Sequence, residues 1–175
     1  VEQDGRYFNR FYFVRPDGAT VHYDKRHLFT YGGEHKEYTG GDRRVIAEYK
    51  GWRILLQVCY DLRFPVWSRN RDDYDMILYV ASWPTPRVEA WNALLKARAI
   101  ENVCYVAGVN RVGDDPNCNY CGGTVLLDFL GKPLADAGTG GQPATLSAEA
   151  DKISLTTFRE KFPALQDADP FTLNI

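Results

Sequence analysis

The strongest candidate for chemistry is Cys59, which ends the apolar run 54–59 and precedes Tyr60-Asp-Leu-Arg-Phe-Pro65. The run predicts a strand covered on both faces, and the carboxyl end of such a strand is where α/β proteins place their sites. A thiolate there could attack a carbonyl carbon, while the backbone N–H of Tyr60 faces the developing oxyanion. The alternative is that Cys59 is one more small buried core residue, because free cysteines are often buried.

Two charged residues could assist such a cysteine. Lys25 follows the strand-like run Val21-His-Tyr-Asp24, and a positive charge beside a thiol lowers its pKa and stabilises an anionic intermediate. Glu34, in Gly32-Gly-Glu-His35, could orient this lysine or move protons. The alternatives are a lysine that keeps a strand end solvated and a glutamate that faces water.

The histidines and the other cysteines offer different chemistry. His27 or His35 could form a thiol–imidazole pair with Cys59, whereas a histidine within a strand, such as His22, is more typical of a structural role. Cys118-Asn-Tyr-Cys121 is a single C-x-x-C pair, and structural zinc needs four ligands. We therefore expect two loop thiols there and no metal site.

Length and composition exclude several classes of protein. The chain has 175 residues and a net charge of −2, from 21 Lys+Arg against 23 Asp+Glu, which fits one domain without the basic surface of a nucleic-acid-binding protein. No run approaches the ~18 apolar residues of a membrane span. Four cysteines are too few for a disulfide scaffold, so we expect a reduced, cytoplasmic protein.

Strand-like and helix-like segments alternate, which predicts an α/β domain with a mixed sheet. A helix is predicted from Pro86 to Asn102, with Thr85 as its N-cap and an apolar stripe through Val88, Trp91, Leu94, Leu95 and Ile100. Asp151 is predicted to cap a short final helix. Strands are predicted over 10–15, 20–24, 45–49, 52–60, 75–82, 104–109, 124–129, 132–137 and 144–149.

Three segments together resemble the nitrilase superfamily of carbon–nitrogen hydrolases. They are Tyr23-Asp-Lys-Arg-His-Leu-Phe29, Val58-Cys-Tyr-Asp-Leu-Arg-Phe-Pro65 and Lys96-Ala-Arg-Ala-Ile-Glu-Asn102, in the family's order. The segment from Gly122 to Gly131 resembles the family's late hairpin, and the resemblance covers essentially the whole chain. The residues after the cysteine, Ala81-Ser-Trp-Pro84 and the tail 160–169 are most similar to the ω-amidase branch, which hydrolyses the terminal amide of 2-oxo acid amides such as 2-oxoglutaramate.

The resemblance implies a fold, a reaction and roles for particular residues. The fold is an α-β-β-α sandwich that associates into a homodimer or a larger oligomer. Cys59 corresponds to the nucleophile, Lys25 and the N–H of Tyr60 to the groups that hold the oxyanion, and Glu34 to the support of the lysine. The reaction is attack of the thiolate on a small amide, loss of ammonia and hydrolysis of the thioester, with no metal or organic cofactor and no nucleic-acid or membrane partner.

One feature departs from the family's pattern. The family's general base is a glutamate ahead of the lysine motif, and here only Glu2 precedes Lys25, at a position that cannot match. We therefore expect residues 1–175 to be a partial carbon–nitrogen hydrolase domain that corresponds to the carboxyl-terminal two-thirds of the family's domain. Such a chain should have little amidase activity alone and should expose apolar surface.

A substrate carboxylate predicts an arginine, because the guanidinium fork matches the anion with two hydrogen bonds. Arg87, just after Trp83-Pro-Thr-Pro86, and Arg111, after Asn110, are the candidates, and Trp83 could form a wall of the pocket. Each could instead be structural or solvated. Asp61 and Arg63 could brace the turn after the cysteine, and Arg98 and Glu101 could form a buried structural pair. A Cys–His thiol hydrolase and a non-catalytic binding module of nitrilase fold stay open as alternatives.

Overall fold

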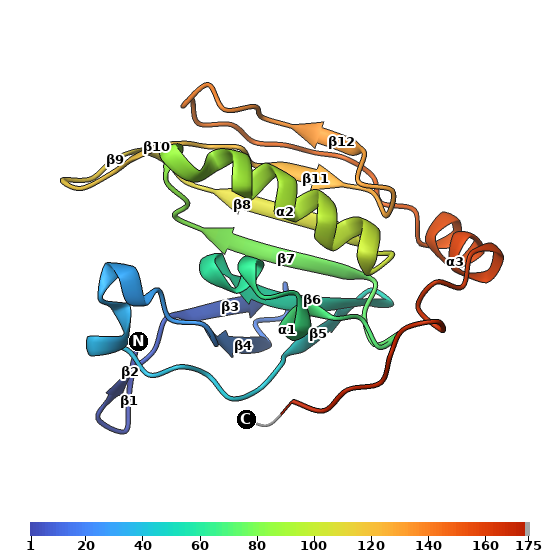
Figure 1. Ribbon diagram of the computed structural model, residues 1–175, viewed down its shortest axis with the longest axis horizontal. Coiled ribbons are helices and arrows are strands. Elements are labelled where there is room, and N and C mark those ends of the chain that lie inside the picture. The colour runs from blue at the N-terminus through green and yellow to red at the C-terminus, as the bar shows by residue number, and fades with distance from the viewer. Residues whose placement is uncertain (174–175) are drawn as a thin grey trace.

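The computed structural model describes residues 1–173, and its centre is a six-stranded mixed sheet (Figure 1). The middle strands β6, β7 and β8 are parallel, and the outer neighbours are antiparallel. The near-continuous apolar sequences of β6, β7 and β8 fit strands that are covered on both faces. The spatial order is β12 (Pro133–Asp136), β11 (Val125–Leu127), β8 (Tyr105–Asn110), β7 (Met76–Ala81), β6 (Trp52–Val58) and β5 (Ile46–Tyr49). Strands are thus confirmed at six of the predicted places.

Three hairpins lie outside this sheet. The pair β3 (Arg10–Val14) and β4 (Thr20–Asp24) is antiparallel and was predicted from the turn residues between the two runs. The pairs β1 (Glu2–Gln3) with β2 (Arg6–Tyr7), and β9 (Val112–Asp114) with β10 (Asn119–Cys121), were not predicted. Strands of two or three residues are too short to show a hydrophobic alternation. Because Cys121 lies in β10, the expectation of two loop thiols holds only for Cys118.

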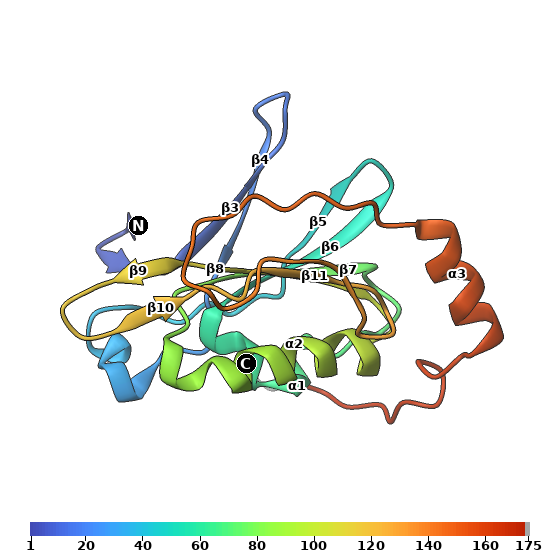
Figure 2. The ribbon, with the colours of Figure 1, turned by 90° about the horizontal axis from the view of Figure 1, so that it is seen from above.

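Different layers cover the two faces of the sheet. Figure 2 shows α1 (Pro65–Ser68) and α2 (Val88–Glu101) on one side and the β3–β4 hairpin on the other. Alternate residues of β6 serve the two layers, because successive side chains of a strand point to opposite faces. Leu55 packs in the cluster beneath α2, whereas Leu56 and Val58 pack with Tyr23 of β4. Among residues 1–173, the second sheet layer implied by the family resemblance is this β3–β4 pair.

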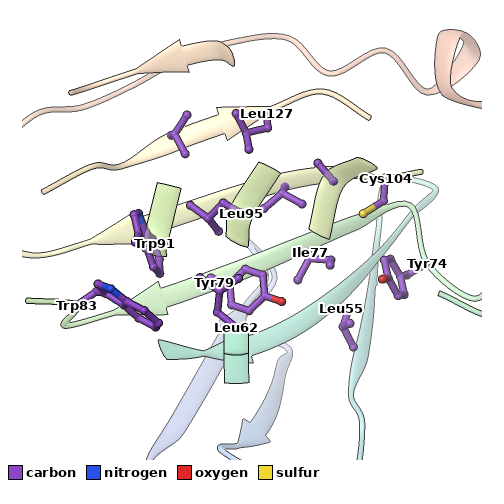
Figure 3. Packing of buried hydrophobic residues seen from close by; sticks show 13 residues of the cluster. Leu55, Leu62, Tyr74, Ile77, Tyr79, Trp83, Trp91, Leu95, Cys104 and Leu127 are labelled. Atoms are coloured by element: carbon purple, nitrogen blue, oxygen red, sulfur yellow. The ribbon is translucent and has the colours of Figure 1, made fainter. Parts of the chain in front are cut away.

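The core beneath α2 is built around aromatic residues (Figure 3). Trp91 and Leu95 of α2 pack in one cluster with Ile77 and Tyr79 of β7. The helix approaches the sheet closely at Gly108 of β8, where a Cβ would lie 2.8 Å from Trp91 Cζ2 and 2.5 Å from Leu95 Cδ1. Glycine is therefore required at this position for the helix to seat on the sheet.

The predicted helix over 86–102 needs two corrections. Thr85 does not cap α2, because Thr85–Arg87 forms a separate 3-10 turn (η4) and the Thr85 hydroxyl donates to the Asn119 carbonyl at 3.0 Å. The apolar stripe does not include Ile100, which is 54% exposed. At about 100° per residue, Ile100 points to the side opposite Trp91. Arg98 is buried instead and pairs with Glu101 at 2.9 Å, so the predicted structural pair is confirmed.

The carboxyl-terminal region contains one wrong and one confirmed prediction. The expected strand over 144–149 does not form, and only Leu146 within it is even half-buried, so the segment has no apolar face to bury. Helix α3 (Lys152–Lys161) begins as predicted, because the Asp151 side chain accepts a hydrogen bond from the Ile153 N–H at 2.8 Å. It packs at the amino-terminal end of β8 through Leu155. No helix in the described part of the chain is long and apolar enough to cross a membrane.

Candidate active site

A cavity of about 470 Å³ lies at the carboxyl ends of β6 and β7. Parallel strands bring their carboxyl ends to the same edge, which is where open α/β sheets bind ligands. From the sequence, seven residues were assigned catalytic, oxyanion or substrate-binding roles in an amidase. The cavity brings together six of them, and the seventh, Arg111, does not line it. The six are Lys25, Glu34, Cys59, Tyr60, Trp83 and Arg87.

Cys59 occupies the sharp turn between β6 and the 3-10 helix η3 (Cys59–Arg63). Its φ of +47° is in the left-handed region, which is strained for a residue with a side chain. The thiol lines the cavity, and Sγ lies 3.9 Å from the Ser82 carbonyl oxygen. Burial raises the pKa of the Cys59 thiol, and the nearby charge of Lys25 only partly opposes this. The thiol is therefore protonated at neutral pH in this arrangement, so a base must remove its proton before attack.

Lys25 forms an ion pair with Glu34 within the cavity wall. Its Nζ lies 2.5 Å from Glu34 Oε2, and its side chain is 3% exposed. Burial disfavours the charged form of Glu34, but hydrogen bonds from Lys25, from the Phe29 N–H and from Asn9 outweigh it and lower the pKa of the carboxyl. Glu34 therefore stays ionised at neutral pH, and its ion pair fixes one end of the lysine side chain.

Asn9 is a contributor that the sequence analysis missed. Its Nδ2 donates to Glu34 Oε1 at 2.8 Å, while the Phe29 N–H donates to Oε2 at 2.6 Å. Glu34 itself lies in a short 3-10 turn, η2 (Glu34–Lys36), rather than in open loop. Asn9 stands alone just before β3, so no motif or periodicity in the sequence pointed to it.

The backbone N–H of Tyr60 belongs to the first turn of η3. N–H groups in the first turn of a helix have no partner within that helix, so this group can donate elsewhere. The Tyr60 ring packs edge-on against Phe29 and Phe64, with ring centroids 5.0 and 5.1 Å apart. These aromatic contacts help to hold the turn in place.

Trp83 forms a rigid wall beyond the end of β7. Asn110, at the end of β8, accepts from the Trp83 N–H at 2.7 Å and donates to the Trp83 carbonyl at 2.9 Å. The indole Nε1–H donates to the Arg87 carbonyl at 2.7 Å. These bonds tie the wall to the neighbouring strand and to η4, which carries Arg87.

Two arginines line the cavity, and both lie over aromatic rings. The Arg87 guanidinium is 5.4 Å from the Phe29 ring centre, and that of Arg63 is 5.1 Å from the Trp83 ring centre. No carboxylate of residues 1–173 lies within salt-bridge distance of either. Arg63 stands in the cysteine motif, but its position in the cavity, rather than in a bracing role, became visible only in the structure.

The structure places the remaining candidates elsewhere. Arg111 stacks on Tyr120 at 4.2 Å and lies 3.6 Å from the Asp115 carboxylate, outside the cavity. His27 stacks on Phe64 and bonds Asp61 through Nδ1, and neither it nor His35 lines the cavity with Cys59. The geometry therefore does not assemble a thiol–imidazole pair. Within residues 1–173, no group of three or more His, Cys, Asp or Glu side chains is arranged to hold a metal ion.

Comparison with known proteins places the chain in a family. Residues 1–160 match the family model described as carbon-nitrogen hydrolase. The chain belongs to the carbon–nitrogen hydrolase family. This hydrolase chain is 57% identical over 166 residues to Omega-amidase YafV of Yersinia enterocolitica and 55% identical to that of Escherichia coli K12. Each alignment covers 94% of the chain and 64% of the relative, so the chain spans less than two-thirds of these proteins.

Other carbon–nitrogen hydrolases agree with this placement. The chain is 32% identical over 170 residues to 2-oxoglutaramate amidase of Bacillus subtilis. That alignment covers 95% of the chain and 65% of the amidase. The crystal structure of XC1258 from Xanthomonas campestris, a CN-hydrolase superfamily protein with an arsenic adduct in its active site, superposes with a TM-score of 0.93 at 47% identity. That superposition covers 99% of the chain and 68% of XC1258. The family and the nitrilase-type fold expected from the sequence are confirmed.

Proposed function

We propose that the complete protein hydrolyses the terminal amide of a small carboxylate-bearing substrate, the ω-amide of a 2-oxo acid such as 2-oxoglutaramate, and releases ammonia. The observation that carries this proposal is that the Cys59 thiol and the Lys25 ammonium line one cavity, with the ammonium held by Glu34. The names of the relatives support the substrate class, since proteins 55–57% identical are omega-amidases.

The proposed reaction has two steps that share one oxyanion site. The Cys59 sulfur, once deprotonated, forms a bond to the amide carbon, and the carbonyl electron pair moves to oxygen. The Lys25 ammonium and the Tyr60 N–H stabilise that charge where it develops. The carbonyl re-forms as the C–N bond breaks, and the nitrogen takes a proton and leaves as ammonia. Water then adds to the thioester and releases the carboxylic acid and the thiol.

The two proton transfers need a base that the described cavity does not offer. Glu34 is the one carboxylate among the lining residues of the described part, and its oxygens already accept bonds from Lys25, Asn9 and the Phe29 N–H. Its lowered pKa makes it a poor acceptor for the proton of a thiol whose own pKa is raised. We therefore propose that residues 1–175 alone have little or no amidase activity.

The substrate carboxylate is proposed to bind Arg87. The guanidinium lines the cavity and lies over Phe29, and among the described residues it pairs with no carboxylate, so its N–H edge can make a bidentate contact with the substrate. Trp83 forms the apolar wall along the carbon chain of the substrate. Arg63 also lines the cavity, over the Trp83 ring, and adds positive charge that favours an anionic substrate.

Ammonia release from 2-oxoglutaramate tests the proposal. In the complete protein, we expect Cys59→Ser to lower turnover about 10⁴-fold or more, because the nucleophile is lost. Cys121→Ser, a thiol outside the cavity, should leave the rate unchanged. The 175-residue chain alone should release little ammonia.

Each part of the proposal has its own contrary outcome. Turnover that survives Cys59→Ser would show that the sulfur is not the nucleophile. A 175-residue chain as fast as the complete protein would show that the base lies within it. A complete protein that binds the amide but releases no ammonia would favour the non-catalytic binding module.

A further inference from the structure

We propose that Asp61 is a positioning residue, whose buried carboxylate holds the Lys25 segment and the Cys59 turn against each other. The inference rests on the proposed function, because the placement of these two groups matters only if both act in one reaction. The observation behind it is separate from the cavity itself. It is the set of hydrogen bonds that one carboxylate collects from two distant stretches of chain.

The Asp61 side chain is fully buried and accepts four hydrogen bonds. Oδ2 accepts from the Tyr23 hydroxyl at 2.8 Å and from the Val58 N–H at 3.0 Å. Oδ1 accepts from the His27 N–H at 3.0 Å and lies 2.8 Å from His27 Nδ1. Every one of these donors is close in sequence to a proposed reacting residue.

These hydrogen bonds fix the chain on both sides of Lys25. Tyr23 stands two residues before the lysine and His27 two residues after it, and both are bonded to the same carboxylate. With both flanks fixed, the short stretch between them has little freedom to move. The carboxylate also fixes the other half of the site, since the Val58 N–H directly precedes Cys59 and Asp61 belongs to the same turn.

The Tyr23 hydroxyl links Asp61 to two further groups on the lysine side. It donates to Asp61 while accepting from the Arg26 N–H at 3.1 Å and from Trp67 Nε1 at 3.0 Å. The Tyr23 ring is fully buried in the cluster that joins β4 to β6. Apolar packing thus fixes the ring, and the hydroxyl transmits that position to the carboxylate.

A neutral amide cannot replace this carboxylate. Two of the four donors are backbone N–H groups, those of His27 and Val58, which lie on different oxygens and cannot turn into acceptors. Asparagine offers one acceptor oxygen, so its NH₂ group must face one of these N–H groups and leave it unpaired. An unpaired buried donor is unfavourable, and the two segments relax apart to reach other partners.

The charge of Asp61 does not explain its presence at the site. A negative charge there raises the pKa of the Cys59 thiol and so opposes formation of the thiolate. If Asp61 acted only through its field, removing the charge would make the thiol more acidic. If it acts through position, removing it separates the thiol from the Lys25 ammonium and makes the thiol less acidic. The two roles therefore predict opposite signs.

A double-mutant cycle on the complete protein measures this position. The alkylation rate of Cys59 by iodoacetamide is followed against pH by mass spectrometry of the Cys59 peptide, which gives the thiol pKa. Lys25→Met should lower the thiolate fraction about 10-fold in the wild-type background, because an adjacent ammonium favours the thiolate. In the Asp61→Asn background the same change should lower it less than about 3-fold. Asp61→Asn alone should also lower the thiolate fraction.

Two further variants keep the test decisive. Asp75→Asn removes a buried, hydrogen-bonded carboxylate at the opposite end of the sheet, and it should leave the Cys59 profile unchanged. Tyr23→Phe keeps the ring and the Asp61 charge but removes one anchor, and it should lower the thiolate fraction about 2-fold. Because Tyr23→Phe changes no charge, it decides the question even if Asp61→Asn does not fold.

The failures of the two proposals are distinguishable. An undiminished Lys25→Met effect in the Asp61→Asn protein, or a more acidic thiol in that variant, overturns the positioning role alone. So does an unchanged profile in Tyr23→Phe. If Lys25→Met has no effect in the wild-type background, the pairing of ammonium and thiolate is wrong, and the proposed function fails together with this inference.

Discussion

The two ends of the parallel strands β6, β7 and β8 both hold buried charge, but they use it differently. At the amino-terminal end, the Asp75 carboxylate lies 2.8 Å from Arg53, 3.0 Å from Lys152 and 3.3 Å from Arg159. At the carboxyl-terminal end, Lys25 has Glu34 as its partner and lines a cavity of about 470 Å³. At the Asp75 end the carboxylate is surrounded by cations, whereas at the cavity end the ion pair lines a space beside the Cys59 thiol.

The comparison extends to the pKa values. Burial disfavours the charged form of both carboxylates, and hydrogen bonds outweigh it in both, so the pKa of Asp75 falls to about 2 and that of Glu34 is also lowered. The difference lies in what surrounds each pair. The strained Cys59 lines the same cavity as the Lys25–Glu34 pair, whereas the cations around Asp75 also donate to main-chain carbonyls. The same kind of interaction thus stabilises the fold at one end, and at the other end we propose that it orients an ammonium for chemistry.

The lysines of the two ends give the largest expected contrast. Lys25→Met should lower amide turnover by the complete protein about 10²–10³-fold, because one oxyanion donor is lost from a preorganised site. Lys152→Met removes a lysine that is 40% exposed and paired with Asp75, so turnover should stay the same. Ammonia release under saturating and limiting substrate measures both effects.

The two ends do not differ in this way if Lys25→Met and Lys152→Met change turnover equally. Equal losses in the two variants would show that Lys25 contributes only stability. To separate folding from chemistry, melting temperatures are measured beside the rates, and Lys25→Met is combined with Glu34→Gln so that no buried carboxylate is left without its cation.

The arginines sharpen the comparison at the cavity end. Arg87→Met should raise KM for 2-oxoglutaramate about 10–100-fold, since a charge-assisted hydrogen-bonded contact to the carboxylate is lost. A neutral amide of the same length should lose less than about 2-fold. Arg111→Met is the matched control, because Arg111 also follows a strand end but stacks on Tyr120 near Asp115. Equal losses for the charged and the neutral amide in Arg87→Met would contradict a carboxylate contact.

Local sequence predicted most of what the site contains. Cys59 could be placed because a continuous apolar run ends at it, and the ends of neighbouring parallel strands meet. Lys25 and Glu34 came together because the segment between them is short and their charges attract. The roles of these residues were suggested by the family resemblance and stay proposals.

What the sequence could not show depends on packing between distant segments. Asn9 reaches Glu34 across a contact that no periodicity encodes. Arg111 was expected at the cavity, but β9 begins directly after it and carries its side chain to Tyr120 and Asp115. Ile100 fitted a helical stripe by residue type, although its angle around α2 points it to solvent, where it is 54% exposed. Residue type and spacing predict elements, but side-chain partners decide which face is buried.

The smallest expected effect is a pH dependence of stability that belongs to the Asp75 end. The pKa of Asp75 is about 2 in the folded chain, below its usual value, so the carboxylate stabilises the fold by about 2 kcal/mol above roughly pH 4. That contribution is lost as the pH falls toward 2, because protonation then removes the bonds from Arg53 and Lys152. Asp75→Asn should therefore be less stable than the wild-type protein at neutral pH, and its deficit should shrink in acid.

Urea unfolding of the wild-type and Asp75→Asn proteins between pH 3 and 7 measures the difference. Since Glu34 and the other carboxyls are common to both, that difference isolates Asp75, and parallel curves would show that its ion pairs contribute nothing to acid sensitivity. Alkylation of Cys59 at pH 7 should be the same in both proteins, because Asp75 lies at the other end of the strands and its partners do not line the cavity.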